Sequence, residues 1–385
     1  MLNFVYQNPV KVVFGKGSIE KITELIPISH KILLTYGGGS IKRNGVYDQI
    51  GKALSGHTVF EFGGIEPNPQ YATLMKAVEI ARSNQVQFLL AVGGGSVVDG
   101  TKFIAAAVHF PGDPWEILSK WAPLEKAVPL GCVLTLAATG TEMNANSVIS
   151  REETKEKLFF SNPLVLPQFS ILDPETTFSL PERQTINGIV DAFVHVMEQY
   201  MTYPVNAPLQ DRQSEAILLT LIEQAPKVLK NPSDYDARAN IMWCATHALN
   251  NIIGCGVPQD WSTHMIGHEL TAFYGIDHAQ SLAIVLPGIL SHQKHQKSEK
   301  LIQYAERVWN VTGTPEEKRD VAIAKTEEFF RSLGMATRLS EYKIGSKDFE
   351  TIAERLSTRL EKIGERQDIG REEIIKILSL RSPIL

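Results

Sequence analysis

Hydrophobic residues in the first half of the chain gather in short runs that end in glycine or polar residues, and amphipathic stretches separate them. The runs are KVVFG, KILLTYGGGS, TVFEFGGI, FLLAVGGGS, GCVLTLAATG and FSILDP. The run from Phe88 to Val92 has no polar position, as expected for a strand covered by helices on both faces. This alternation of strand and helix predicts an α/β domain over residues 1–178, with a Rossmann-like, mostly parallel sheet.

After Ser179 the strand-like runs disappear and successive helical patterns replace them. Ser179 and Glu182 form a capping-box pattern with Pro181 inside the first turn, so a helix is predicted to begin there and to run to about Tyr203. Further helices are predicted over residues 206–230, 235–254, 259–273, 278–293, 296–309, 316–333 and 347–363. Residues 179–385 are therefore expected to form an all-helical domain.

Composition places the chain in the ordinary globular class, because 43% of its 385 residues are hydrophobic and its formal net charge is -5. No run of Lys and Arg offers an electrostatic footprint for nucleic acid or anionic lipid. The first residues lack the features of a secretory signal, and the three cysteines lack C-x-x-C spacing. We expect a cytoplasmic protein with small-molecule partners and with no nucleic acid or membrane among its partners.

A glycine-rich loop follows the buried run that begins at Phe88. Its sequence is Gly93-Gly94-Gly95-Ser96, and a helical pattern starts directly after it. Three glycines let the backbone approach a pyrophosphate, and the helix N-terminus supplies N–H groups and a favourable dipole. The spacing differs from G-x-G-x-x-G, so a tight strand-to-helix turn without a ligand is the alternative interpretation.

A second glycine run, Gly37-Gly38-Gly39-Ser40, ends an earlier strand-like segment. NAD enzymes usually place an acidic residue at such a strand end to bind the ribose 2′-hydroxyl, and that carboxylate would repel a 2′-phosphate. None stands here, and Lys42 and Arg43 follow instead. The run favours NADPH over NADH, with a flexible surface turn as the alternative.

Metal-competent residues cluster in the second half at helical spacing. Asp191 and His195 are four residues apart, His264 and His268 repeat that spacing, and His278 begins another predicted helix. One carboxylate with imidazoles suits Fe²⁺ or Zn²⁺ better than Ca²⁺ or Mg²⁺. A zinc hydrolase is disfavoured because the H-E-x-x-H order is absent. Spacing alone leaves open whether His268 or His278 is the ligand.

These motifs together resemble the iron-containing (group III) alcohol dehydrogenase family over essentially the full chain. They are GGGSVVDGTK at 93–102, TGTE at 139–142, DAFVH at 191–195, HMIGH at 264–268 and GIDH at 275–278. The segments FGGIEPNP at 62–69 and VPQDW at 257–261 look most like its NADPH-dependent aldehyde reductase and butanol dehydrogenase branch. The resemblance implies a dehydroquinate synthase-like fold and metal-assisted reduction of small aldehydes to primary alcohols, or the reverse oxidation.

The resemblance also implies a role for each candidate site residue. It makes Asp191, His195, His264 and His278 the ligands of one divalent metal ion and places His268 beside the metal. His268, or a relay through the cofactor ribose and water, would deliver the proton to the alkoxide, and the sequence does not choose between them.

The residues implied to bind the cofactor follow its length from the adenosine 2′-phosphate to the nicotinamide. They are Gly37, Gly38, Gly39 and Ser40 at the 2′-phosphate, Asn68 near the adenosine, Gly94, Gly95 and Ser96 at the pyrophosphate, and Asp99, Thr135, Thr139 and Thr141 toward the nicotinamide. Asp99 is also a candidate catalytic residue. Lys157 matches a lysine that reaches the 2′-phosphate in this branch, with Lys155 as a competitor.

Two other functions remain to be weighed against the reductase. A dehydroquinate synthase needs several cationic residues for its phosphorylated substrate, and residues 184–200 and 258–280 contain no Lys or Arg. A nucleotide sensor without turnover would not need a complete ligand set.

The segment from Phe4 to Phe14, interpreted as an exposed strand, predicts a homodimer through edge pairing.

Overall fold

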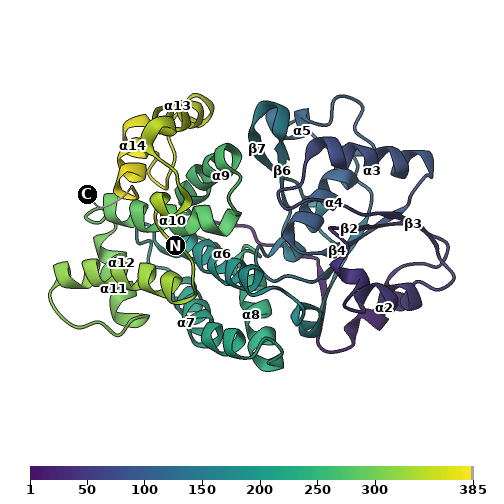
Figure 1. The fold of residues 1–385 in the computed structure, drawn as a ribbon, viewed down its shortest axis with the longest axis horizontal. Coiled ribbons are helices and arrows are strands. Elements are labelled where there is room, and N and C mark those ends of the chain that lie inside the picture. Colours follow the sequence, from purple (N-terminus) through teal and green to yellow (C-terminus); the bar gives the residue numbers. More distant parts are fainter. Residues whose placement is uncertain (383–385) are drawn as a thin grey trace. The chain divides into compact units, whose positions relative to one another are not determined.

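The computed structural model describes residues 1–382 of the chain (Figure 1). The chain divides into two compact units, which are described separately. The α/β unit contains Gln7–Glu182 and Lys230–Thr246. The helical unit contains residues 1–6, 183–229 and 247–382. A single cut in the chain does not separate these units, and the predicted domain boundary after residue 178 stays a prediction.

A six-stranded parallel sheet forms the centre of the α/β unit, with the strand order β1-β8-β5-β4-β2-β3. Each of the six hydrophobic runs forms one strand, which confirms the predicted Rossmann-like sheet. The strands are β1 (Lys11–Phe14), β2 (Lys31–Tyr36), β3 (Thr58–Phe62), β4 (Phe88–Gly93), β5 (Leu130–Leu134) and β8 (Phe169–Leu172).

Helices cover both faces of this sheet. Successive strand residues point to opposite faces. Accordingly, Leu33 packs into the core beneath α3 and α4, whereas Leu34 packs into the core beneath α1 and α2. Burial on both faces explains why the strand sequences show no polar alternation. The helices on the two faces are α1 (Ile22–Leu25), α2 (Val46–Ala53), α3 (Tyr71–Ser83), α4 (Gly95–Ala107) and α5 (Glu116–Ser119).

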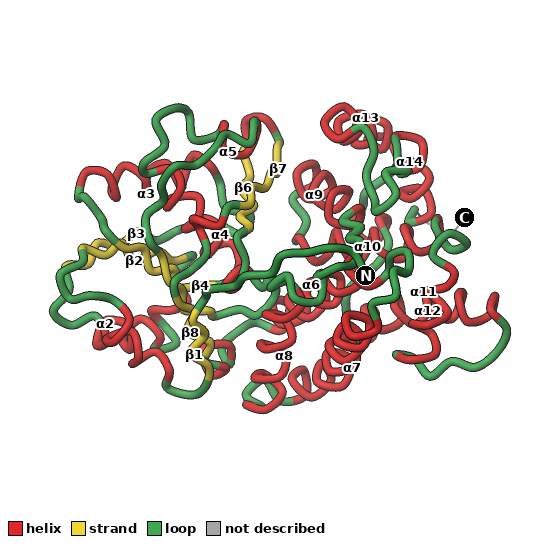
Figure 2. Tube along the Cα trace, turned by 180° about the vertical axis from the view of Figure 1, so that it is seen from behind, coloured by secondary structure: helices red, strands yellow, loops and turns green. Residues whose placement is uncertain are grey.

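Two features of the α/β unit differ from the sequence prediction: an additional pair of strands, and a helix from later in the chain that packs against this unit. An antiparallel pair, β6 (Asn146–Arg151) and β7 (Glu156–Ser161), lies outside the main sheet (Figure 2). Helix α8 (Tyr235–Ala248) also packs here, because Met242 joins a core cluster with strand residues and Thr246 donates a hydrogen bond to Glu142.

The helical unit is built around α6 (Glu182–Tyr200), which is buried along almost its whole length. A helix buried on all sides lies in the core of its unit. Phe193 packs on two phenylalanines of α12, and Tyr200 on Tyr304 of α11. The other helices are α7 (Pro208–Lys230), α9 (Ser262–Tyr274), α10 (His278–His292), α11 (Ser298–Arg307), α12 (Pro315–Ser332), α13 (Phe349–Leu360) and α14 (Arg371–Leu380).

Short 3-10 helices connect the longer elements of both units. They are η1 (Ser18–Lys21), η2 (Ser40–Lys42), η3 (Thr141–Met143), η4 (Glu152–Thr154), η5 (Pro163–Val165), η6 (Pro174–Thr177), η7 (Leu339–Tyr342) and η8 (Ser346–Asp348). Within residues 1–382, no helix is both long and apolar enough to cross a bilayer.

Three local predictions differ from the structure. Helix α6 begins at Glu182, and the Ser179 hydroxyl accepts a hydrogen bond from Asn44 instead of forming the predicted capping box. Of the predicted strand from Phe4 to Phe14, only Lys11–Phe14 is a strand, because the preceding residues have no ladder partner. Helix α14 was missed, although Ile374, Ile377 and Leu378 show helical spacing and are buried.

Gly131 generates a stability prediction for the sheet. A Cβ atom at Gly131 would lie 2.5–2.8 Å from ring atoms of Phe169, whose ring stacks on Phe88. We expect Gly131→Ala to lower the free energy of unfolding by about 1–3 kcal/mol, the usual cost of overpacking. Urea denaturation measures this change. The control is Gly51→Ala at an exposed position of α2, where no atom lies within 4 Å of the added Cβ atom. Equal effects of both variants would contradict the prediction.

Candidate nucleotide loops and metal centre

The turn between β4 and α4 is packed so closely that side chains would not fit there. A Cβ atom at Gly94 would lie 2.9 Å from Leu136, and one at Gly95 would lie 2.6 Å from the Thr139 hydroxyl. The Thr135 N–H also donates to the Gly93 carbonyl at 2.9 Å. The glycines thus let the segment after β5 lie against the first turn of α4, where helix N–H groups favour an anion.

Asp99 and Lys102 hold the chain after this segment in place. The two carboxylate oxygens of Asp99 accept hydrogen bonds from the Thr141 hydroxyl at 2.6 Å and from the Val148 N–H at 3.0 Å. The buried Lys102 ammonium donates to the carbonyls of Thr141 and Asn144. Burial lowers the pKa of Lys102 to about 8 and raises the pKa of the Asp99 carboxyl. Both carboxylate oxygens of Asp99 therefore already accept hydrogen bonds from protein groups. A catalytic role for Asp99 stays a prediction.

Asn68, Ser96 and Lys157 lie together although they are far apart in the sequence. The Asn68 N–H donates to the Ser96 hydroxyl at 3.3 Å, and the Lys157 ammonium donates to the Asn68 side-chain oxygen at 2.9 Å. Lys157 is buried on β7, whereas Lys155 is exposed in the turn before that strand. The structure thus brings Lys157 together with the other two predicted cofactor residues.

The Gly37–Ser40 run forms the turn between β2 and the short helix η2. Gly39 has a φ of 86°, in the left-handed region that favours glycine. No atom lies within 4 Å of a Cβ built at Gly38 or Gly39, so this turn is open on its outer side. An open turn with polar groups suits an anionic ligand.

The topology brings a carboxylate to this turn that linear sequence analysis did not reveal. Glu61 on β3 accepts hydrogen bonds from the hydroxyl groups of Tyr36 and Tyr47 and pairs with Lys42 at 3.4 Å. The Lys42 ammonium lies 4.9 Å and 4.7 Å from the centroids of the two tyrosine rings. Glu61 and Lys42 thus already contact groups of opposite charge in the protein. The parallel pairing of β2 with β3 is the only signal that would have located Glu61.

The helical unit brings the predicted metal-competent residues together. Asp191 and His195 lie one turn apart on α6, His264 lies on α9, and His278 is the first residue of α10. Asp191, His195 and His264 each offer one donor atom within 4.8 Å of the others. The Nε2 atoms of His195 and His264 are 3.0 Å apart, and Nε2 of His278 lies 3.6 Å from Oδ1 of Asp191.

These separations fit a four-coordinate ion. Tetrahedral coordination with metal–ligand distances near ~2.1 Å places neighbouring donor atoms about 3.3 Å apart. Nε2 of His264 lies 3.0 Å from Nε2 of His195 and 3.9 Å from Oδ1 of Asp191, and Nε2 of His278 lies 3.6 Å from the same Oδ1. Two imidazole Nε2 atoms that face each other cannot both be protonated without a clash, and a cation between them satisfies both lone pairs. The donor set thus matches the borderline ions Fe²⁺ and Zn²⁺.

Burial favours the neutral form of His195. Desolvation lowers the pKa of His195 to about 4, and the nearby Asp191 carboxylate only partly opposes that change. His195 is therefore neutral at physiological pH, and a neutral imidazole is the form that binds a metal.

Glu198 is a residue of this site that the sequence analysis missed. It lies on α6 one turn after His195, and its carboxylate accepts a hydrogen bond from Nδ1 of His264. Its spacing from Asp191 and His195 places all three on one helix face, and that spacing was the signal available in the sequence.

His268 lies next to the predicted ligands but is not in the group of Asp191, His195 and His264 whose donor atoms lie within 4.8 Å of one another. Its ring centroid is 6.2 Å from that of His264 and 5.2 Å from that of His278. The four predicted ligand positions and His268 thus occupy one region of the helical unit.

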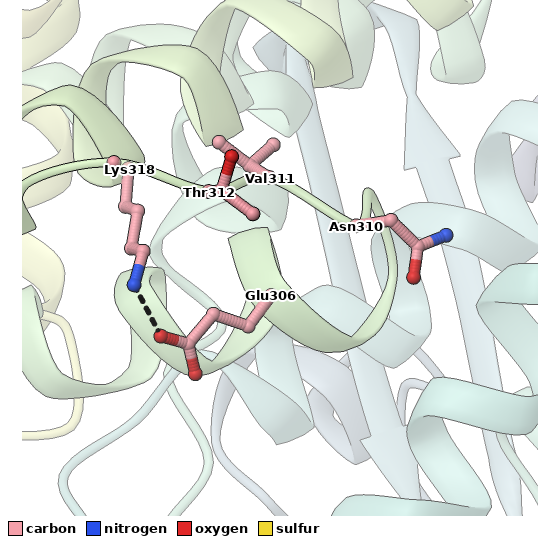
Figure 3. A pocket seen from close by; sticks show the side chains of 6 residues that line it. Glu306, Asn310, Val311, Thr312 and Lys318 are labelled. Atoms are coloured by element: carbon pink, nitrogen blue, oxygen red, sulfur yellow. Dashed lines mark hydrogen bonds and ion pairs between the residues drawn. The ribbon is translucent and has the colours of Figure 1, made fainter.

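A pocket elsewhere in the helical unit lies beside the loop that joins α11 to α12 (Figure 3). Its lining includes Glu306 and Lys318, whose ion pair spans 2.6 Å. It contains none of the predicted site residues, so it is not the predicted active site.

Comparison with known proteins identifies the class. The family described as "Iron-containing alcohol dehydrogenase" matches residues 9–174, and the family described as "Fe-containing alcohol dehydrogenase family, C-terminal" matches residues 185–381. The chain therefore belongs to the iron-containing alcohol dehydrogenase family of oxidoreductases, as its motifs predicted.

Among individual proteins, the chain is similar to the NADPH-dependent aldehyde reductase YqhD of Escherichia coli, with 55% identity over 96% of this chain and 97% of the relative. A crystal structure of Escherichia coli YqhD superposes with a TM-score of 0.97 and 53% identity, over 99% of both chains. The probable NADH-dependent butanol dehydrogenase 1 of Bacillus subtilis is 44% identical over 98% of this chain and 99% of the relative.

The cluster geometry predicts the consequence of removing one imidazole. We expect the unaltered protein to bind about one Zn²⁺ per chain and His195→Ala to lose most of that metal, because a buried four-donor site then lacks a ligand. Elemental analysis after dialysis measures the metal content. His292→Ala, at the far end of α10, is the matched control and is expected to retain the ion. Full metal content in His195→Ala would contradict the ligand assignment.

Proposed function

We propose that this chain is a metal-dependent aldehyde reductase that uses NADPH to convert small aldehydes into primary alcohols, and that it also catalyses the reverse oxidation. The observation that carries the proposal is the convergence of Asp191, His195, His264 and His278 in a protein whose other unit bears two glycine-rich nucleotide loops. The similarity to the NADPH-dependent aldehyde reductase YqhD of Escherichia coli supports it.

In this proposal Asp191, His195, His264 and His278 hold one divalent ion, either Fe²⁺ or Zn²⁺. A divalent ion at such a site acts as a Lewis acid toward a carbonyl oxygen, and the nicotinamide of NADPH supplies the hydride. The protein contributes three imidazoles and one carboxylate, which bind the ion and orient the aldehyde, and all of these except His278 are buried.

The preference for NADPH rests on the turn after β2. Gly37, Gly38, Gly39 and Ser40 offer N–H groups and a hydroxyl without a carboxylate of their own. The nearby Glu61 is paired with Lys42, so its repulsion of a 2′-phosphate is reduced. Lys157 adds a positive charge beside Asn68. Relatives named as NADPH-dependent and as NADH-dependent both occur, and in this proposal the turn after β2 selects between the two cofactors.

The remaining assignments complete the proposal. Gly94, Gly95 and Ser96 bind the pyrophosphate, and Asp99, Thr135, Thr139 and Thr141 order the site toward the nicotinamide. His268 contacts the substrate and takes part in proton transfer. The enzyme works in the cytoplasm as a homodimer. Its buried cysteines suit a reducing compartment, and the exposed Phe4 and Val5 offer apolar surface to a second copy.

The direct test is turnover by the purified, metal-loaded enzyme. Loss of NADPH absorbance on adding short aldehydes, abolished by a chelator and restored by Fe²⁺ or Zn²⁺, is the expected result. Stoichiometric binding of NADPH with no aldehyde-dependent oxidation would favour a nucleotide sensor and would refute the reductase.

Gly39 provides a test of cofactor selection. Gly39→Asp places a carboxylate at the open turn, where it can bind a ribose 2′-hydroxyl and repel a 2′-phosphate. We expect the ratio of kcat/KM for NADPH to that for NADH to fall at least to about one, a change of roughly tenfold or more if one charge interaction of about 1.4 kcal/mol is reversed. Gly39→Asn, which tolerates the same positive φ without the charge, is the control. An unchanged ratio in Gly39→Asp would count against the assignment.

The two histidines near the cluster test the division between ligand and substrate contact. We expect His278→Ala to lose the metal, whereas His268→Ala keeps it and shows a kcat lower by about 10²-fold, the usual size of a lost acid–base contribution. Metal content and steady-state kinetics are measured on both variants together. Loss of metal from His268→Ala with retention in His278→Ala would exchange the two assignments.

A further inference from the structure

Helix α6 carries a third ionisable side chain on the face that bears Asp191 and His195. Glu198 lies seven residues after Asp191 and three after His195, which are both helix-face spacings. Its side chain is 2% exposed, and it is thus as deeply buried as Asp191, His195 and His264. A buried carboxylate needs several hydrogen-bond donors to offset the loss of hydration.

All the donors that the structure shows for Glu198 come from the start of α9. Its carboxylate accepts the backbone N–H of Thr263 at 2.6 Å and that of His264 at 3.3 Å. The Nδ1 atom of His264 also contacts the same carboxylate. The first N–H groups of a helix have no intrahelical partner, so Glu198 caps α9 as well as holding the imidazole.

The contact with Nδ1 determines which nitrogen of His264 is available to a cation. When Nδ1 carries the proton and donates it to Glu198, Nε2 keeps its lone pair. That Nε2 atom lies 3.0 Å from Nε2 of His195 and 3.9 Å from Oδ1 of Asp191. Glu198 therefore aims the lone pair of His264 at the other predicted ligands. A hydrogen-bond acceptor on the far side of the ring also raises the basicity of this nitrogen toward a metal.

A second buried charge cluster holds the same end of α9. The Lys297 ammonium pairs with Asp260 at 2.9 Å and with Glu365 at 2.7 Å. Asp260 in turn accepts the backbone N–H of Ser262 at 3.0 Å, and its own N–H donates to the Glu198 carbonyl at 2.9 Å. The start of α9 is thus fixed from both sides, which leaves His264 little freedom to turn away from α6.

We propose that Glu198 is a positioning residue of the metal centre: it fixes the tautomer and orientation of His264 and thereby sets the affinity for the divalent ion. It acts through His264 and contacts neither substrate nor cofactor in this role. The inference rests on the proposed function, since it requires that His264 is a ligand. The competing account is that Glu198 only caps α9 and affects stability alone.

The test compares Zn²⁺ affinity in Glu198→Gln and Glu198→Ala with that of the unaltered protein, by competition with a chromophoric chelator. We expect Glu198→Ala to bind Zn²⁺ about 10- to 100-fold more weakly, the usual effect of removing such a partner. Glu198→Gln keeps the volume and one acceptor oxygen, so its loss is expected to be smaller. If the alanine variant does not fold, the glutamine variant decides the result.

The matched control is Glu215→Gln. Glu215 is another buried carboxylate of the helical unit and accepts hydrogen bonds from Tyr200, Gln303 and Arg307. It contacts none of the predicted ligands, so its variant is expected to lose stability without a change in Zn²⁺ affinity.

A second readout separates positioning from capping. With saturating Co²⁺, the ligand-field absorption bands report the geometry and donor strength at the ion, and we expect them to shift in Glu198→Gln. Unchanged Zn²⁺ affinity and unchanged bands, together with a lower melting temperature of the metal-free variant, would show capping alone and overturn the proposal. Absence of stoichiometric Zn²⁺ binding in the unaltered protein would instead refute the metal centre itself.

Discussion

Burial of ionisable groups is the constraint on which the helical unit depends. Asp191, His195 and Glu198 lie on a helix that is almost completely enclosed, and an isolated charge there would be strongly destabilising. Each of these groups therefore has a partner drawn from α9 or α10. The same constraint lowers the pKa of His195, so burial favours the neutral imidazole, which is the form that can bind a metal.

The α/β unit depends on a different constraint, which is the close approach of the segment after β5 to the first turn of α4. Gly94 and Gly95 leave room for the segment after β5, and Lys102 then holds the chain beyond it through buried hydrogen bonds to carbonyls. Asp99 also helps to hold this segment in place, because both of its carboxylate oxygens accept hydrogen bonds from protein donors. The loop between β4 and α4 is therefore held in place by packing and hydrogen bonds within the protein.

Some of the structure follows from local pattern and some does not. The six strands were predictable because uninterrupted apolar runs such as Phe88 to Val92 suit only a sheet covered on both faces. The hairpin of β6 and β7 was not predicted, since its short strands form a pair apart from the main sheet. The start of α6 was misplaced because Ser179 bonds to Asn44, which is distant in the sequence and competes with the local cap.

For the site, the sequence by itself determined which residues are able to bind a metal, because Asp191 with His195 and His264 with His268 share helix faces through spacing alone. It determined the glycine loops for the same local reason. Only the tertiary structure decided which helices face one another. That packing brought Nε2 of His195 to 3.0 Å from Nε2 of His264, placed Glu198 behind His264, and paired Glu61 with Lys42. Spacing along the sequence determines the face of a helix or strand on which a side chain lies. The residue that it contacts is determined by which helices and strands pack together, and these are far apart in the chain.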